Sequence, residues 1–362
     1  MRYFRIAALF ILNFLLIATV SGQTPKQTIP VPGDPLELAT GPALIADTPD
    51  KRASILALLE RARQNNNLHA MGISPFDLKV SFNSNGPSLY SGGGDLEETW
   101  VSRSTWKWTA HLGTYSQARI FYRGLAYDLN PHAYLPLRLQ MVRQAIFWPV
   151  SGNFANDVIR VAASNWNGKA ITCALIAGPR AEATSAPGRQ SNEEEFCIDP
   201  TSGLLQTYSI APGIYDVYDY TDALKFHGRN IARRISIIEN GSAVLQVQLN
   251  DIADLNTTDV SLFTPGPEMK GPGVMIGGPM RFPQVVKKDS ALSSAGVVQP
   301  VIIHAALDAD GKVLEAEALQ SPGSPLSEAA LELVKNTNYG RTRSGIPLER
   351  DVFINVQFVS PQ

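Results

Sequence analysis

A long series of short β-type runs, separated by turn residues, extends from about Phe76 to Leu255 and constrains the fold more than any other feature. The runs are rich in β-branched and aromatic residues, which favour strands. Strands joined by short turns pair antiparallel, because parallel strands need long crossover connections. Asn240-Gly241, between the last two runs, predicts a type I′ hairpin, since both residues tolerate a positive φ. The sequence therefore predicts a large antiparallel sheet.

Two helical segments accompany this sheet. Thr48-Pro49 supplies an N-cap followed by proline at the first helical position, and Asn65-Asn66-Asn67 ends the apolar period that follows. A second helix is predicted over about Leu135 to Phe147, ending near Pro149. Because the apolar face of a sheet must be covered, we expect this second helix to lie on the sheet.

This layout resembles the half-barrel of periplasmic lipoprotein carriers over residues 50–255. The strand Gly94–Trp100 (GDLEETW), the turn Cys197–Leu205 and the Asn-Gly hairpin contribute to the resemblance. It implies a concave face that holds acyl chains and is lined by aromatic side chains. The alternative is that these side chains fill the core between sheet and helix. The aromatic candidates are Trp100, Trp106, Trp108 and Trp148.

A Gly- and Pro-rich stretch, residues 264–282, predicts a linker and a domain boundary. Two β runs follow, the first ending at Leu307 and the second spanning Val313 to Leu319. Ser324-Pro325 opens an amphipathic helix, and Val352 to Phe358 alternates with the period of a half-buried strand. The predicted order is β-β-α-β, with the helix packed across a small sheet.

Four segments of residues 283–359 resemble the TonB C-terminal family: Gly296–Val298, Leu307–Val313, Leu326–Leu331 and Val352–Phe358. The chain departs from the family after the helix, where an aromatic residue is present but the usual proline is missing. The resemblance implies that the last strand pairs with a short segment of an envelope protein such as an outer-membrane receptor. The alternative is a plain edge strand blunted by the charges of residues 349–351. The candidate partner-binding residues are Val352, Phe353, Ile354, Asn355, Val356, Gln357 and Phe358.

The N-terminal residues have the layout of a secretory signal. Arg2 and Arg5 precede an apolar run from Ile6 to Val20, and small residues follow before Gln23. We expect residues 1–22 to be a signal peptide and residues 23–47 a linker, which places the mature chain in the periplasm; the alternative is an uncleaved anchor. Without Arg2 and Arg5 the 31 basic residues fall to 29 against 33 acidic ones, a net charge of −4. That charge does not suit nucleic acid.

The two cysteines, Cys173 and Cys197, lie in separate strand-like runs. In an exported protein such a pair favours a disulfide, worth about 3 kcal/mol for a loop of this length. The alternative is two unpaired buried thiols. Either interpretation makes the cysteines structural.

No catalytic or metal-binding motif emerges. The five histidines are scattered, and none forms a recognisable metal-ligand spacing. His304 is interpreted as a surface or hydrogen-bonded strand residue. We predict an α+β, non-enzymatic chain without catalytic residues, metal or cofactor, with a β-rich half-barrel domain (48–263) and a C-terminal domain of TonB type (283–362). The expected function is strand addition to a partner protein in TonB-dependent transport. The alternative is a carrier of a hydrophobic ligand or lipoprotein through the β domain.

Overall fold

The computed structural model describes residues 38–39, 41–86, 90–130, 134–182, 185, 187–255, 259–271, 273, 275–276, 280–287, 301–319, 324–340 and 348–359. The predicted signal peptide lies outside these residues. Three α-helices are described: α1 (Pro49–Asn66), α2 (Leu137–Phe147) and α3 (Pro325–Lys335). The first strands in chain order are β1 (Leu44–Ile45), β2 (Phe76–Ser84), β3 (Gly92–Ser102), β4 (Thr105–Leu112), β5 (Tyr115–Tyr122), β6 (Leu125–Asp128) and β7 (Val158–Trp166). Those that follow are β8 (Lys169–Ala177), β9 (Glu194–Ile198), β10 (Leu205–Ser209), β11 (Ile214–Asp219), β12 (Leu224–Phe226), β13 (Arg229–Ile231), β14 (Arg234–Glu239) and β15 (Ser242–Asp254). The last are β16 (Met275–Ile276), β17 (Met280–Lys287), β18 (Val301–Leu307), β19 (Val313–Ala318) and β20 (Leu348–Val359).

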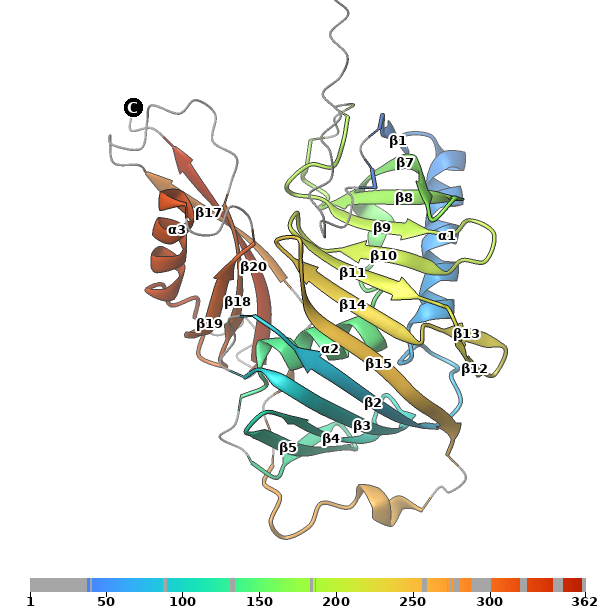
Figure 1. The fold of residues 1–362 in the computed structure, drawn as a ribbon, viewed down its shortest axis with the longest axis vertical. Coiled ribbons are helices and arrows are strands. Elements are labelled where there is room, and N and C mark those ends of the chain that lie inside the picture. The colour runs from blue at the N-terminus through green and yellow to red at the C-terminus, as the bar shows by residue number, and fades with distance from the viewer. Residues whose placement is uncertain are drawn as a thin grey trace, which may run out of the picture.

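One strongly curved sheet organises residues 44–254, which we call the curved-sheet unit (Figure 1). Within the described residues its strands run in the order β1-β7-β8-β9-β10-β11-β14-β15-β2-β3-β4-β5-β6. Their pairings are antiparallel, as the sequence predicts. The long strand β15 pairs with β2 and joins the early hairpins to the later ones. The sheet has two ends, β1 and β6, and does not close into a barrel.

The predicted turn and cap residues adopt the expected conformations. Asn240 and Gly241 have φ of 50° and 72°, which confirms the primed hairpin between β14 and β15. Thr48 Oγ1 accepts a hydrogen bond from the backbone N–H of Lys51, so α1 begins at the predicted cap. Pro49 occupies the first turn, where its missing N–H would be unpaired in any case.

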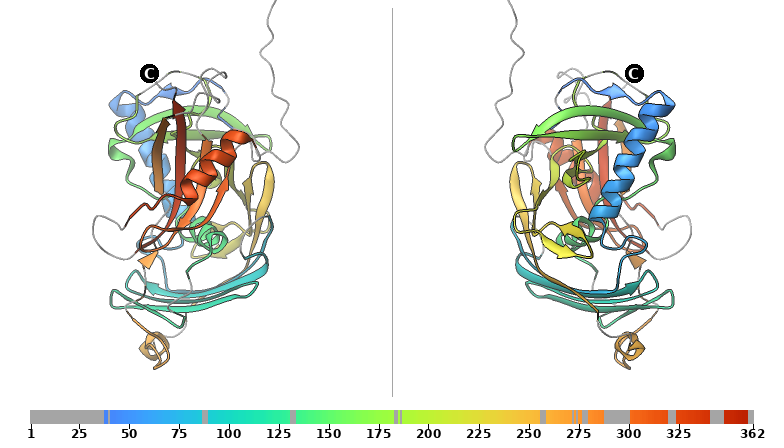
Figure 2. Two further views of the ribbon diagram at one scale, coloured as in Figure 1. Left: turned by 90° about the vertical axis from the view of Figure 1, so that its left-hand side faces the viewer. Right: turned by 90° about the vertical axis from the view of Figure 1, so that its right-hand side faces the viewer.

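Helix α2 runs through the hollow of the curved sheet (Figure 2). Leu139, Val142 and Phe147 have no solvent exposure. They share one hydrophobic core with α1 and with inward side chains of the strands. The helix also buries Arg138, Gln140 and Arg143 in this apolar setting. These polar residues therefore need partners inside the molecule, and they define the sites described below.

The second unit, residues 275–359, is called the C-terminal unit. Strands β18, β19 and β20 and helix α3 form the expected β-β-α-β arrangement, with Ser324 capping α3. The sequence did not predict β17, which pairs in parallel with β20 along its whole length. β18 pairs with the other side of β20. The predicted edge strand is thus an inner strand of this sheet.

The two units share a core. Ile302, Ala306 and Phe353 face the curved-sheet unit and belong to the same hydrophobic cluster as α2. Glu315 of β19 accepts a hydrogen bond from the backbone N–H of Leu137, the first residue of α2, at 3.3 Å. An acidic group is favourable there because the first N–H groups of a helix have no partner within it.

Parts of both segments that the sequence predicts as linkers pair with strands of the two units. Leu44 and Ile45 pair with β7 inside the stretch 23–47. Within the stretch 264–282, Lys270 pairs with Asp128 at the β6 edge, and β17 begins at Met280. These segments are rich in proline and glycine, yet parts of them still pair with the edge strands β6 and β7.

Candidate ligand-binding cavity

A cavity of about 920 Å³ lies between α2 and strands β3 to β6. This volume falls in the range typical of small-molecule sites. Gln140 lines it near the start of α2 and Trp148 just after the end. Eight residues of helix span about 12 Å, so the cavity extends along most of α2. At its outer end the lining includes Met71, which is 81% exposed, and the exposed Arg103.

Aromatic rings form much of the wall. Trp106 of β4 stacks on Phe121 of β5 with centroids 5.0 Å apart. His69 lies between Trp100 at 3.8 Å and Phe147 at 4.2 Å, and Trp148 meets it edge-on. Trp100, Trp106, Phe121 and Trp148 all line the cavity. Adjacent strands bring these rings together because the inward positions of each strand recur every second residue.

A buried group of charges supports this wall. Glu98 of β3, 1% exposed, accepts a hydrogen bond from Arg143 of α2 at 2.7 Å and also contacts His69 Nε2. Burial opposes the charge of Glu98, but Arg143 and His69 outweigh it and keep its pKa below the ordinary value. Burial lowers the pKa of His69, and Glu98 offsets this effect only in part.

The Arg143 guanidinium lies against several aromatic faces. It is 4.9 Å from the centroid of Phe147, 5.0 Å from that of Trp108 and 5.7 Å from that of Trp106. Cation–π contacts of this kind strengthen when water is excluded. Arg143 thus ties α2 to β3 through Glu98 and to β4 through the rings. It holds the helix and the sheet at a fixed separation, which keeps the cavity open.

A second buried pair lies on the same wall. Arg119 of β5 binds Asp128 of β6 through two hydrogen bonds of 2.5 and 2.9 Å. Both side chains are at most 5% exposed. The two-pronged geometry suits a guanidinium and a carboxylate and fixes the last hairpin of the sheet.

The C-terminal unit reaches the cavity through Asp351 of β20. Asp351 Oδ1 accepts a hydrogen bond from His304 Nε2 at 2.7 Å, and His304 Nδ1 is 2.9 Å from Glu239 at the end of β14. Arg138 of α2 donates to Glu239 at 2.6 Å and to Glu317 of β19 at 3.0 Å. Five ionisable side chains from both units therefore meet in one cluster, which we call the docking cluster.

Burial and mutual repulsion set the protonation of this cluster. Burial disfavours the charged form of His304, but the carboxylates of Asp351 and Glu239 raise its pKa to about 10. Burial, Asp351 and Glu239 raise the pKa of the neighbouring Asp216 to about 8. Burial and Glu239 likewise raise the pKa of Glu317 to about 8. Against the opposing effect of burial, His304 and Arg138 lower the pKa of Glu239, so near neutral pH charged His304 and Glu239 lie beside protonated Glu317 and Asp216.

The predicted binding strand does not have the expected free edge. In the described residues, 352–358 pair with β17 on one side and β18 on the other for most of their length. Val352, Ile354 and Val356 are buried under α3, while Phe353 is buried against the curved-sheet unit. The prediction of an exposed strand was wrong because residues 264–282 were taken as a linker and no strand was predicted over 283–287, whereas β17 spans Met280–Lys287 and pairs with β20.

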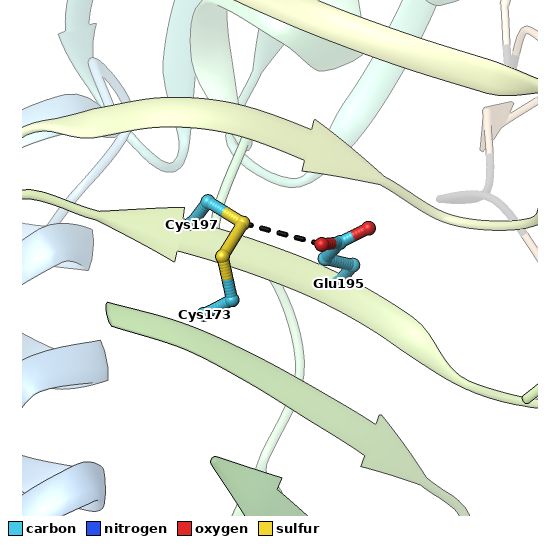
Figure 3. A group of neighbouring side chains, drawn as sticks. All are labelled: Cys173, Glu195 and Cys197. Carbon is cyan, nitrogen blue, oxygen red and sulfur yellow. Dashed lines mark hydrogen bonds between the residues drawn. A yellow bond between two sulfur atoms is a disulfide. The ribbon is translucent and has the colours of Figure 1, made fainter. Parts of the chain in front are cut away.

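The predicted disulfide between Cys173 and Cys197 is confirmed (Figure 3). The two residues face each other directly across β8 and β9, with Cα atoms 4.0 Å apart. Both are fully buried in a satellite cluster with Leu38, Ala39 and Leu175. Glu195 lies beside the Cys197 sulfur at 3.3 Å. The bond is remote from the cavity, so its role is structural.

The tryptophans fit both interpretations. Trp100 and Trp108 belong to the hydrophobic core, and Trp106 and Trp148 pack against it, as the alternative predicts. Trp100, Trp106 and Trp148 also line the cavity, whereas Trp108 does not. His304, left open between a surface and a hydrogen-bonded position, is fully buried and bonded on both ring nitrogens.

Sequence reasoning missed the charged residues of the wall. Glu98 lies between Leu96 and Trp100 at the inward positions of β3, where a buried acid requires a cationic partner. Arg143 interrupts the apolar pattern of α2 in the same way. These two interruptions were the available signal, although neither indicates which residue is the partner of the other.

No known protein-family model matches the chain, and no curated protein is significantly similar to it. The TonB resemblance of residues 283–359 therefore rests on the sequence pattern alone. No helix in the described part of the chain has the length and apolar character needed to cross a bilayer.

Several solved structures share part of the fold. A LolA superfamily protein from Nitrosomonas europaea aligns with a TM-score of 0.39 and 12% identity, over 58% of this chain and 97% of that one. A putative outer membrane lipoprotein-sorting protein domain from Vibrio parahaemolyticus gives 0.37 and 7%, over 57% and 95%. MucB gives 0.28 and 12%, over 60% and 65%. These alignments assign no function to the chain.

Proposed function

We propose that this chain is an exported envelope protein that binds or carries a hydrophobic ligand in the cavity between α2 and the curved sheet. The observation that carries the proposal is the 920 Å³ volume walled by Trp100, Trp106, Phe121 and Trp148. A core that only needed filling would close around such rings, because protein interiors pack to high density. The proposal assigns no catalytic step to the chain.

The wall can supply enough free energy for a reversible carrier. Burying a methylene group contributes about 0.8 kcal/mol, so about ten methylenes give a gross gain of about 8 kcal/mol. Loss of ligand freedom opposes this gain. Because a Kd of about 1 μM corresponds to about 8 kcal/mol, the expected affinity for a single chain is weaker than micromolar, which permits both uptake and release.

An envelope location is part of the proposal. The signal-like N-terminus supports it, and so does the buried disulfide, since such bonds persist in oxidising compartments. A periplasmic carrier is supported better than strand addition in TonB-dependent transport, because residues 352–358 are already paired within the described chain. We do not propose the strand-addition function.

Occlusion of the cavity tests the proposal. Ala126, 2% exposed, lines the cavity from β6, so Ala126→Trp places an indole in the space without removing a wall residue. Binding is measured by displacement of the fluorescent probe N-phenyl-1-naphthylamine with methyl dodecanoate, and by native mass spectrometry. We expect measurable binding to the unmodified chain, with an affinity that falls at least tenfold in Ala126→Trp.

Trp166→Ala provides a matched control, because Trp166 of β7 packs on the satellite cluster and does not line the cavity. It should keep the binding of the unmodified chain. Absence of probe binding in the unmodified chain, or equal binding in folded Ala126→Trp, would overturn the proposal.

A further inference from the structure

The end of the cavity nearest the start of α2 is polar, unlike its aromatic wall. Gln140 of α2 is 5% exposed and lines this end. Its Nε2 donates to the backbone carbonyl of Leu135 at 2.8 Å, whereas its Oε1 has no hydrogen-bond partner within the described chain. A buried carbonyl oxygen left without a donor costs about 1–3 kcal/mol. This oxygen exposes less than 1 Å², so an occupant that supplies an N–H or O–H group would pair with it after a small rotation of the amide toward the cavity.

Asp351 adds a second acceptor at the same cavity. One carboxylate oxygen is used by His304. No side chain or backbone group of the described residues donates a hydrogen bond to the other oxygen. Asp351 comes from the last strand, whereas Gln140 comes from α2, so two units of the molecule place acceptors at one cavity.

Several carboxyl groups gather around this end of the cavity. Glu239 and Glu317 belong to the docking cluster behind Asp351, and Asp216 borders a small neighbouring cavity that Asp351 also lines. Arg138 and His304 are already bonded to these carboxylates. A ligand carboxylate or phosphate would meet the carboxylate of Asp351, and two arginines of the cavity wall, Arg119 and Arg143, are already bonded to Asp128 and Glu98. A hydroxyl or ammonium group meets none of this repulsion.

We propose that Gln140 and Asp351 form a specificity site for the hydrogen-bond-donating group of a long-chain amphiphile, an alcohol or an amine, whose apolar chain lies along the aromatic wall. This inference rests on the proposed function and names the ligand class for that cavity. It makes the C-terminal unit part of the binding site. The two parts of the site have different roles: the rings bind the apolar chain, and the two acceptors select its polar group.

Three probes of equal chain length test the inference: 1-dodecanol, dodecylamine and methyl dodecanoate, the last of which lacks a donor. Affinities are measured by displacement of N-phenyl-1-naphthylamine from the full chain. One or two added hydrogen bonds predict that the alcohol and the amine bind roughly five- to tenfold more tightly than the ester. In Gln140→Met, which keeps the volume and removes the acceptor, this preference should largely disappear while ester binding is unchanged.

Two further variants sharpen the assignment. Asp351→Asn keeps an acceptor oxygen but removes the charge, so it should weaken the amine more than the alcohol. Gln64→Met makes the same replacement as Gln140→Met at an exposed lining position and should leave the preference intact. Equal binding of all three probes, or a preference that survives both Gln140→Met and Asp351→Asn, would overturn this inference and leave the proposed function standing. If no probe binds, both proposals are wrong.

Discussion

The ion pair between Glu98 and Arg143 predicts a specific thermodynamic signature. Glu98 is 1% exposed and Arg143 is 3% exposed, and each is the main charged partner of the other. Glu98→Gln keeps the shape and a hydrogen-bonding oxygen but leaves the arginine as an uncompensated buried cation. Removing one partner of such a pair typically costs about 3–5 kcal/mol. We expect a loss of that size in the free energy of unfolding.

The loss can be followed through the tryptophans, because all five lie in the curved-sheet unit. One kcal/mol lowers Tm by roughly 2 °C in chains of this size, so Glu98→Gln should lower the Tm seen by fluorescence by roughly 6–10 °C. Arg143→Met fits between the rings and removes the stranded cation. The double variant Glu98→Gln/Arg143→Met should therefore recover most of the loss, since uncharged replacements of buried ion pairs are often neutral. A Tm drop under about 2 °C for Glu98→Gln, or additive losses in the double variant, would refute the reasoning.

Three further predictions concern the disulfide and the docking of the C-terminal unit. Replacing both Cys173 and Cys197 by serine opens a loop with a sequence separation of 24 and should lower the free energy of unfolding in urea by about 3 kcal/mol, without a change in ligand affinity. Phe353→Ala removes a ring that stacks on His304 at 4.2 Å, so limited proteolysis should release the C-terminal unit from the curved-sheet unit much faster; unchanged cleavage would contradict the shared core. Raised pKa values mean that the folded state holds extra protons, from His304 between about 6.5 and about 10 and from Asp216 between 3.8 and about 8. Stability should therefore fall as pH rises through these windows, and Asp216→Asn should flatten the fall in Tm measured between pH 5 and 8.

Local patterns gave much of the fold correctly. Thr48-Pro49 marks the start of α1, and Asn240-Gly241 marks a hairpin, because both depend on neighbouring residues only. The alternation of Val352, Ile354 and Val356 correctly predicted a strand with one face under a helix. Such patterns report which side of a strand is buried.

Long-range pairing was where prediction from the sequence failed. The same alternation says nothing about which strands lie beside β20, and β17 approaches it in parallel across a large separation in sequence. The alternation predicted a half-buried strand, but both faces of β20 are buried. Phe353 packs against the curved-sheet unit, while Val352 and Ile354 pack under α3. An edge is a property of the whole sheet, so one strand cannot reveal it.

The charges at the junction of the two units connect the fold to the proposed function. An apolar junction alone would hold the units together equally well at every pH. Here the docking cluster places His304 between Glu239 and Asp351, and Asp351 also lines the ligand cavity. A ligand that donates a hydrogen bond to Asp351 acts on the carboxylate that His304 uses for docking. The proposed ligand site and the docking cluster thus share one residue, and by reciprocity we expect a condition that weakens docking to alter the affinity for such a ligand.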